Sequence, residues 1–226
     1  NERVLRARLA DAQFFFDEDR KKSLMAHREK LKTVVFQEGL GTVYEKTERL
    51  ARLAETIGEK LGATAEETAQ ARRAALLSKA DLVTGMVTEF TELQGIMGRA
   101  YALLDGEEKA VALAIDEHYR PRFAGDAEPE TVPGRILSLA DKMDNIVATF
   151  SRGLVPTGSQ DPFALRRQAL GLSNMLIRAK YSLSISMIAD QAMDLLHITE
   201  QAARKNLRQE IAAFLRLRLK NIFDEE

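Results

Sequence analysis

The sequence has 226 residues, which is enough for one large domain or two small ones with a proper hydrophobic core. Its 33 Lys and Arg residues nearly balance its 34 Asp and Glu residues, so the net charge of -1 excludes a global electrostatic attraction to nucleic acid or to a membrane surface. Any basic site must therefore be a local patch. The absence of Cys excludes disulfides and thiolate metal sites, and it makes a reducing, cytoplasmic setting our expectation.

The ends of the sequence and its hydropathy bear on targeting. No apolar run approaches the roughly 20 residues that a membrane-spanning helix needs, so we expect no membrane partner. The chain begins NERVLRARL, which is neither a Met start nor a signal peptide. We therefore expect it to be a piece of a longer protein.

Helical periodicity begins at once. The apolar residues of 5–16 recur four, three and four positions apart, which predicts an amphipathic opening helix. The charged run 17–22 predicts a solvated turn, and 24–36 carries weak helical or mixed signals.

Three capping signals organise the next part of the chain. The sequences at 42–45 and 64–67 have the Thr-x-x-Glu form of a capping box, and 91–94 has the related Thr-x-x-Gln form. Gly62 is a natural stop for the first of these helices. The helices that the three signals predict run over 43–61, 65–82 and 92–105.

The central helix follows a loop. A helix over 107–118 leads into YRPRFAGDAEPETV at 119–132, where Pro, Gly and Asp end the periodicity. Pro133 then opens PGRILSLADKMDNIVATF, a helix with a strong apolar stripe, which we take as the centre of the chain. Asp141 and Asp144 lie three apart beside the stripe, so both can point into a groove or at another helix. The alternative is a pair of solvated or capping acids.

The C-terminal part is also helical. After a loop over 151–161, Asp161 and Pro162 supply an N-cap and a first-turn proline. The last predicted helices run from there to about 179, over 184–197 and over 200–222.

These elements give an all-α fold, because no convincing alternating strand occurs anywhere. The Gly- and Pro-containing loop after the central helix is the clearest boundary. We therefore divide the chain into a first domain, 1–150, and a helical extension, 151–226.

A divalent metal site can be assembled from residues on two of these elements. His118 ends one helix, and the loop after it leads directly to Asp141 and Asp144. Neutral imidazole and carboxylates are suitable ligands for a divalent ion. No Walker phosphate loop and no Gly-x-Ser-x-Gly nucleophile motif is present.

The order of four short strings, RLA at 49–51, AALL at 74–77, EHY at 117–119 and LADKMD at 139–144, resembles the HD metal-phosphohydrolase fold. The resemblance implies an HD-like helical bundle, here with additional C-terminal helices.

The metal ligands of that family are mostly replaced. The resemblance puts the family's first His near Lys46 and its His-Asp pair at Ser78 and Lys79, or at Ala80 and Asp81 if the alignment slips. Asp141 matches the family's last Asp, His118 matches the region of an accessory His, and Asp144 follows in the same motif. A cationic amine repels a divalent ion, so we expect no bound metal and no nucleotide hydrolysis.

Longer strings carry a closer resemblance over nearly the whole chain. NERVLRARLADAQFFFDEDRK, LKTVVFQEGLGTVYEKTERL, SKADLVTGMVTEFTELQGIMGRAYA, EHYRPRFAGD and PTGSQDPFALRRQALG are similar to the β subunit of bacterial tetrameric glycyl-tRNA synthetases. This implies a heterotetramer in which an α subunit, using ATP and Mg, carries the glycylation site while the β subunit handles tRNA(Gly). The present chain would hold no cofactor and no catalytic residue, would be inactive alone, and would end in a truncated anticodon-binding domain.

One helix face is a candidate for the tRNA contact. Over 165–178 the apolar residues can face the core, which leaves a polar stripe on another face. Gly171 on this stripe would let a phosphate backbone approach closely. The candidate tRNA-binding residues, two of them on neighbouring loops, are Arg122, Arg152, Arg166, Arg167, Asn174 and Arg178. Two alternatives stay open: an active HD phosphohydrolase acting on nucleotides, and a purely structural helical scaffold.

Overall fold

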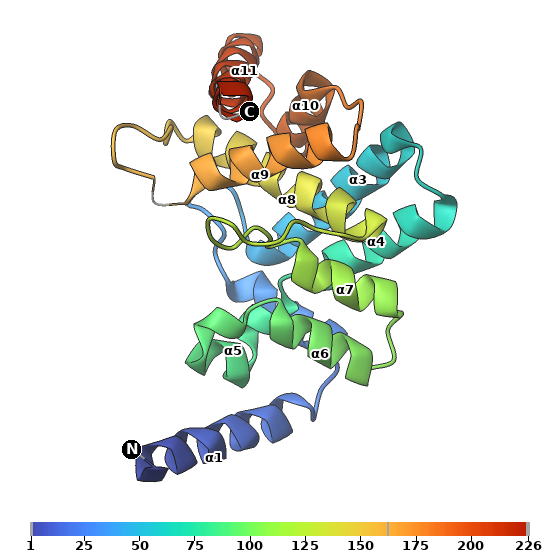
Figure 1. Cartoon of the computed structure of the whole chain (residues 1–226), viewed down its shortest axis with the longest axis vertical. Helices are drawn as coiled ribbons and strands as arrows, with labels where there is room; N and C mark the ends of the chain where they lie inside the picture. The colour runs from blue at the N-terminus through green and yellow to red at the C-terminus, as the bar shows by residue number, and fades with distance from the viewer. Residues whose placement is uncertain (1, 162, 225–226) are drawn as a thin grey trace.

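The computed structural model describes residues 2–161 and 163–224, and all regular secondary structure in them is helical (Figure 1). Two isolated β-bridges are the only β-type pairing in this described part, so the prediction of an all-α fold is confirmed. The α-helices are α1 (Glu2–Asp19), α2 (Leu24–Arg28), α3 (Val43–Leu61), α4 (Ala65–Leu77), α5 (Gly85–Glu89), α6 (Ile96–Leu104), α7 (Lys109–Glu117), α8 (Val132–Ser151), α9 (Leu165–Arg178), α10 (Ile185–Leu195) and α11 (Gln201–Asp224). Three short 3-10 helices are Glu29–Thr33, Ala80–Val83 and Thr91–Leu93.

Helix α8 is the centre of the molecule, as predicted. It packs against α3, α4 and α7 from the first part of the chain and against α9, α10 and α11 from the second (Figure 1). Its polar residues Asp141, Lys142 and Asp144 are buried together with its apolar ones. One hydrophobic core contains side chains from both sides of position 150, and the two-domain division stays a prediction.

Local capping starts α3 and α4 at the predicted residues. In α3 the Thr42 hydroxyl accepts from the Glu45 backbone N–H at 3.2 Å, and the Glu45 carboxylate accepts from the Thr42 N–H at 2.7 Å. Thr64 and Glu67 repeat the pair at the start of α4. Gly62 ends α3 with φ of 70°, the left-handed conformation that glycine adopts without steric cost.

The start of α6 and the end of α4 differ from the predictions. The predicted helix over 92–105 begins at Ile96, because the buried carboxylate of Asp81 accepts from the N–H groups of Gly95 at 2.6 Å and Gly98 at 2.9 Å. The helix predicted over 65–82 ends at Leu77 and gives way to a 3-10 turn.

Helix α5 was not predicted. Its N-terminal N–H groups at Gly85 and Met86 donate to the Asp19 carboxylate at 2.7 and 2.9 Å. The Tyr101 hydroxyl donates to the same carboxylate at 2.7 Å. Asp19 is the last residue of α1, so this one buried side chain joins α1, α5 and α6.

Helix α9 begins at Leu165, later than predicted. Asp161 still caps it, because its carboxylate accepts from the N–H groups of Leu165 at 2.8 Å and Arg166 at 2.9 Å. The residue at the N-cap position is Ala164, which has a φ of 52°. Pro162, which was predicted to occupy the first turn, lies outside the described residues.

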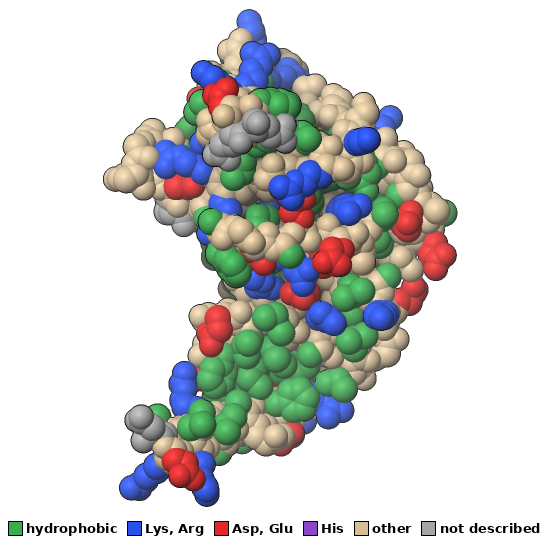
Figure 2. All heavy atoms as spheres, in the orientation of Figure 1, with side chains coloured by type: hydrophobic (Ala, Val, Ile, Leu, Met, Phe, Trp, Pro, Cys, Tyr) green, Lys and Arg blue, Asp and Glu red, His purple; other side chains and the backbone are tan. Residues whose placement is uncertain are grey.

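The opening helix α1 lies at one edge of the molecule and packs against α5 (Figure 1). The predicted apolar face is largely exposed in its first half, where Leu5 and Leu9 keep 60% and 61% of their surface accessible. Figure 2 shows hydrophobic side chains gathered over α1, α5 and α6. None of the helices within 2–161 and 163–224 has the length and apolar character that crossing a bilayer requires.

Candidate functional site

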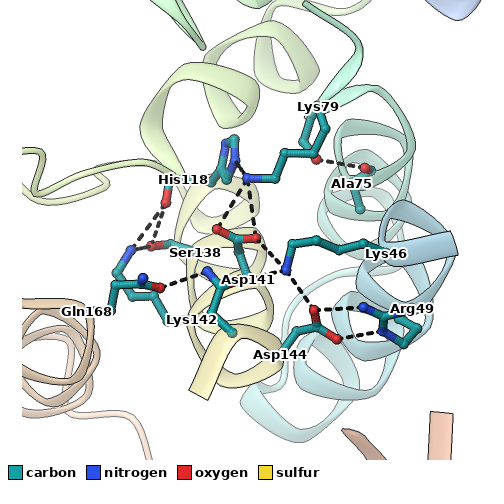
Figure 3. Close-up of polar contacts among 12 residues, drawn as sticks. Lys46, Arg49, Ala75, Lys79, His118, Ser138, Asp141, Lys142, Asp144 and Gln168 are labelled. Atoms are coloured by element: carbon teal, nitrogen blue, oxygen red, sulfur yellow. Dashed lines mark hydrogen bonds and ion pairs between the residues drawn. The ribbon is translucent and has the colours of Figure 1, made fainter. Parts of the chain in front are cut away.

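A buried cluster of charged side chains joins α3 and the C-terminal end of α4 to α8 (Figure 3). Lys46 and Arg49 come from α3, Lys79 follows α4, and Asp141 and Asp144 project from the middle of α8. All five side chains are less than a tenth exposed. The alternative that the two aspartates are solvated is therefore wrong.

Asp144 is held by two cations. Its carboxylate accepts from Lys46 Nζ at 2.6 Å and from Arg49 Nε and Nη2 at 2.8 and 3.2 Å. Burial acts to raise the pKa of Asp144, but the neighbouring Lys46 and Arg49 charges outweigh it and hold the pKa below the ordinary value. Asp144 is therefore ionised and ties α3 to α8.

Lys79 lies between His118 and Asp141. Its Nζ is 2.8 Å from His118 Nε2 and 3.3 Å from Asp141 Oδ2. The other ring nitrogen of His118, Nδ1, donates to the Ile115 carbonyl at 2.6 Å, so Nε2 accepts from the lysine. Burial and the Lys79 charge keep the pKa of His118 well below its ordinary value, so the imidazole is neutral.

This arrangement does not fit a divalent metal. His118 and Asp141 do converge as the sequence suggested, but they converge on an ammonium group, and Lys46 Nζ lies 3.3 Å from Asp141 Oδ1 on the other side. Across residues 2–161 and 163–224, no three His, Cys, Asp or Glu side chains are placed to share an ion. Two cations stand where metal ligation would need lone pairs. That a purified sample carries no metal stays a prediction.

The two remaining positions of the HD resemblance serve the local backbone. The buried Ser78 hydroxyl donates to the Ala75 carbonyl at 2.8 Å. Asp81 caps α6, as described above, and its other carboxylate oxygen has no partner. Burial raises the pKa of Asp81 to about 6, against the opposing effect of the Gly95 and Gly98 N–H groups.

Lys142 is a buried cation that sequence reasoning did not select. Its Nζ donates to the carbonyls of His118 at 3.2 Å and Arg120 at 2.9 Å and to Ser138 Oγ at 2.6 Å. Burial lowers its pKa to about 8, against the raising effect of Asp141. Its position next to Asp141 on a helix that is buried on nearly all sides was the available signal.

Two hollows flank the loop 119–132. The first, which we call the α8 pocket, has a volume of about 530 Å³ and lies over the charged cluster, with Lys79, His118, Asp141 and Lys142 in its wall. The second, which we call the α9 groove, has a volume of about 810 Å³ and lies between this loop, α9 and α11. Residues shared by both walls are Pro121, Phe123 and Arg167.

Most of the predicted α9 stripe lines the α9 groove. Arg166, Arg167, Asn174 and Arg178 all border it. Arg167 and Arg178 are exposed, and Arg178 pairs with Glu128 of the loop at 3.3 Å. The structure therefore places these side chains together, while their contact with tRNA stays a prediction.

The proposed role of Gly171 was wrong. The residue is buried, and a Cβ on it would lie 2.8 Å from Pro121 Cδ and 3.4 Å from Lys142 Cε. The missing side chain therefore makes room for the loop of this chain rather than for a phosphate backbone.

The two loop arginines lie in different surroundings. Arg122 lines the α8 pocket, where its guanidinium donates to the Gln94 carbonyl at 2.8 Å and pairs with Asp116 at 3.0 Å. Arg152 caps the C-terminus of α8, with its guanidinium beside Gly39, and it borders neither hollow. Arg152 is thus separate from the α9 stripe.

Fold and site together define a class: an all-helical domain with buried lysine–aspartate ion pairs at its centre and a groove rich in arginine nearby. Comparison with known proteins gives the family. The glycyl-tRNA synthetase beta subunit family model matches residues 1–226, and the chain belongs to this family.

Individual relatives agree with this assignment. The glycine--tRNA ligase beta subunit of Desulforamulus reducens is 52% identical over the whole chain, and those of Clostridioides difficile and Halothermothrix orenii are 51% and 50% identical. The chain spans about a third of the length of these curated relatives, 33% of the first and 32% of the other two.

Proposed function

We propose that this chain is a tRNA-binding part of a glycine--tRNA ligase β subunit. In this role it supports ATP-dependent glycylation of tRNA(Gly), which an α subunit carries out with ATP and Mg, in a cytoplasmic heterotetramer. The part proposed here holds no cofactor of its own and does not charge tRNA alone. Family membership supports the assignment, and the α9 groove supports the tRNA contact.

The observation that carries the tRNA contact is the gathering of arginines in the α9 groove. Arg166, Arg167 and Arg218 border it, and none of them forms an ion pair with a carboxylate in the described part of the chain. Burial and the nearby Arg166 charge lower the pKa of Arg218, against the opposing effect of the Asp161 carboxylate. Such a site is stabilised by anions, and guanidinium groups are suited to phosphate oxygens.

An aromatic side chain at the groove's edge adds a second feature of nucleic-acid sites. Phe123 keeps 62% of its surface exposed at the tip of the loop. Exposed aromatic rings next to cations are platforms on which unpaired bases stack. The groove thus offers both backbone and base contacts.

The test removes two arginines of the groove. Replacing Arg167 and Arg178 together by Ala is expected to weaken tRNA(Gly) binding. It should also lower the slope of log affinity against log salt by about one to two units, because fewer phosphate contacts release fewer counterions from the tRNA. Filter binding at several salt concentrations measures both. The matched control replaces Arg52 and Arg72, which are also exposed and lie on α3 and α4, and should leave the slope unchanged.

The two alternatives make different predictions for these experiments. A structural scaffold would show the same affinity and slope in both double variants with normal helical content, and this result would refute the tRNA contact. An active phosphohydrolase would need the metal centre that Lys46 and Lys79 replace. The geometry thus favours the tRNA reading over the hydrolase.

A further inference from the structure

The α8 pocket carries an excess of positive charge, because its wall contains two carboxylates, Glu92 and Asp141, and four cations, Lys79, Arg122, Lys142 and Arg167. Lys79 in its wall is paired with Asp141, and Arg122 is paired with Asp116. Lys142 and Arg167, which also line the pocket, form no ion pair with a carboxylate anywhere in 2–161 or 163–224.

Lys142 is the more costly of the two. Only 3% of the residue is exposed, and its ammonium group contacts three neutral oxygens rather than a carboxylate. Asp141 and Glu128 act on this charge without a direct contact. A buried charge with no directly bonded counterion is unfavourable, because neutral acceptors replace only part of its hydration. An anion in the pocket would supply the missing countercharge.

Tyr119 provides a hydrogen-bond donor with no acceptor. Its hydroxyl is buried and has no hydrogen-bond partner among the described residues, while its ring packs against the His118 ring with centroids 3.9 Å apart. Buried hydroxyl groups are normally bonded, so this hydroxyl, in a residue of the pocket wall, lacks the acceptor that such groups usually have. An oxygen that only accepts, such as one of a phosphate, would satisfy it.

The rest of the wall suits the nucleoside attached to such a phosphate. Phe163 and Phe123 line the pocket and keep 44% and 62% of their surface exposed, so either ring is available for stacking. The Asn145 and Gln168 amides also line the pocket, and they are held in place by the bond from Asn145 Nδ2 to Gln168 Oε1 at 2.8 Å. The volume of about 530 Å³ lies in the range of small-ligand sites.

We propose that the α8 pocket binds one nucleotide, with its phosphate between Arg167 and the Tyr119 hydroxyl in the field of Lys142, and its base against Phe163 or Phe123. The lysines occupy the place where a related fold would bind a metal ion, and their positive charge favours a phosphate anion in the pocket. The nucleotide is either an unstacked residue of an RNA or a free mononucleotide. The RNA source rests on the proposed function, because the pocket and the α9 groove share Arg167.

The proposal is tested by monitoring the NMR signal of Lys142 during titrations. The chain, labelled with ¹³C at the lysine ε carbons, is titrated with cytidine 5′-monophosphate, with inorganic phosphate and with a single-stranded RNA tetranucleotide, and Lys142→Arg identifies the Lys142 signal. We expect a saturable change of that signal, with the mononucleotide binding about 5- to 100-fold more tightly than inorganic phosphate because its base stacks. Equal changes with chloride or sulfate at the same ionic strength would overturn the proposal as ion screening, and no change with any phosphate would do so as well.

Tyr119→Phe is the sharpest variant. The hydroxyl has no partner in the chain, so its removal should leave the fold intact. We expect mononucleotide affinity to fall about 3- to 10-fold, the effect of one hydrogen bond. Tyr181→Phe, a matched change on a tyrosine that does not line the pocket, should have no effect. Equal affinities for the two variants would overturn the placement of the phosphate.

Arg166→Ala separates this proposal from the tRNA proposal, because Arg166 borders the groove but not the pocket. It should weaken tRNA binding and leave mononucleotide binding unchanged. Competition then identifies the source: tRNA that displaces the mononucleotide supports an RNA nucleotide, and tRNA that leaves it bound supports a free one. If Arg166→Ala weakens mononucleotide binding as strongly as tRNA binding, the two hollows are one site and the proposal of a separate pocket fails.

Discussion

Removing the charge of Asp144 while keeping its shape tests how the buried cluster acts. Asp144→Asn leaves the packing unchanged but places Lys46 and Arg49 against a neutral amide, in a site where Asp144 is completely buried. Breaking a buried ion pair by neutralising one partner costs about 3–5 kcal/mol, because the remaining charge stays desolvated without compensation. Asp141 still lies 3.3 Å from Lys46, so we expect the lower part of this range.

Urea and thermal denaturation measure this loss. For a chain of this size, about 3 kcal/mol corresponds to a fall of about 6–12 °C in Tm. The urea midpoint should fall with an unchanged m-value, because the surface exposed on unfolding stays the same. Asp11→Asn, at an exposed position on α1, should change stability by less than about 0.5 kcal/mol. A loss below about 1 kcal/mol for Asp144→Asn would refute the view that Lys46 and Arg49 depend on this carboxylate.

Two further predictions concern residues whose roles the structure revised. Gly171→Ala should destabilise the chain by up to about 2 kcal/mol in denaturation experiments, because the clash with Pro121 exceeds the gain in helix propensity. Unchanged stability would mean that the loop containing Pro121 moves aside freely. Burial raises the pKa of Asp81 from 3.8 to about 6, so the folded state binds more protons and its stability falls as pH rises from about 4 to about 6. Asp81→Asn should remove about 2 kcal/mol of that fall between pH 4 and pH 7, measured by urea unfolding, and an identical pH dependence in both proteins would contradict the assignment.

Helix starts show what local sequence can and cannot predict. Thr42 and Thr64 cap α3 and α4 through the residue three positions later, so a short window contained the whole signal. Thr91 offered the same pattern, yet α6 begins five residues later because Asp81 supplies its acceptor from outside the window. At α5, Asp19 adds acceptors across 66 positions to a local cap by Thr84. A buried carboxylate brought by tertiary packing therefore outweighs a local capping box, and sequence periodicity does not reveal it.

The candidate site divides in the same way. Resemblance to a metal-binding family located Lys46, Lys79 and Asp141, and the structure brings them together as that resemblance required. The sequence did not single out Lys142, because a lysine beside an aspartate on a helix is usually solvated. Lys142 is unusual only because α8 is buried on nearly all sides. Gly171 was misread because its neighbour, Pro121, is 50 positions away and no helical pattern contains it.

The role of the buried ion pairs is better explained by the way they position the lysine side chains than by a gain in folding stability. Buried ion pairs often stabilise a fold no more than apolar side chains of the same volume, because desolvation offsets the attraction. Apolar side chains would not hold charged groups in fixed directions. Here the Lys79 ammonium group is directed at His118 and Asp141, and Lys142 donates to the His118 carbonyl. Both cations are thus fixed by contacts with His118, one with its ring and one with its carbonyl, so the charge that faces the α8 pocket is held in place before any ligand arrives. A pocket prepared in this way spends little conformational entropy on binding an anion, which favours recognition of a single phosphate by few contacts.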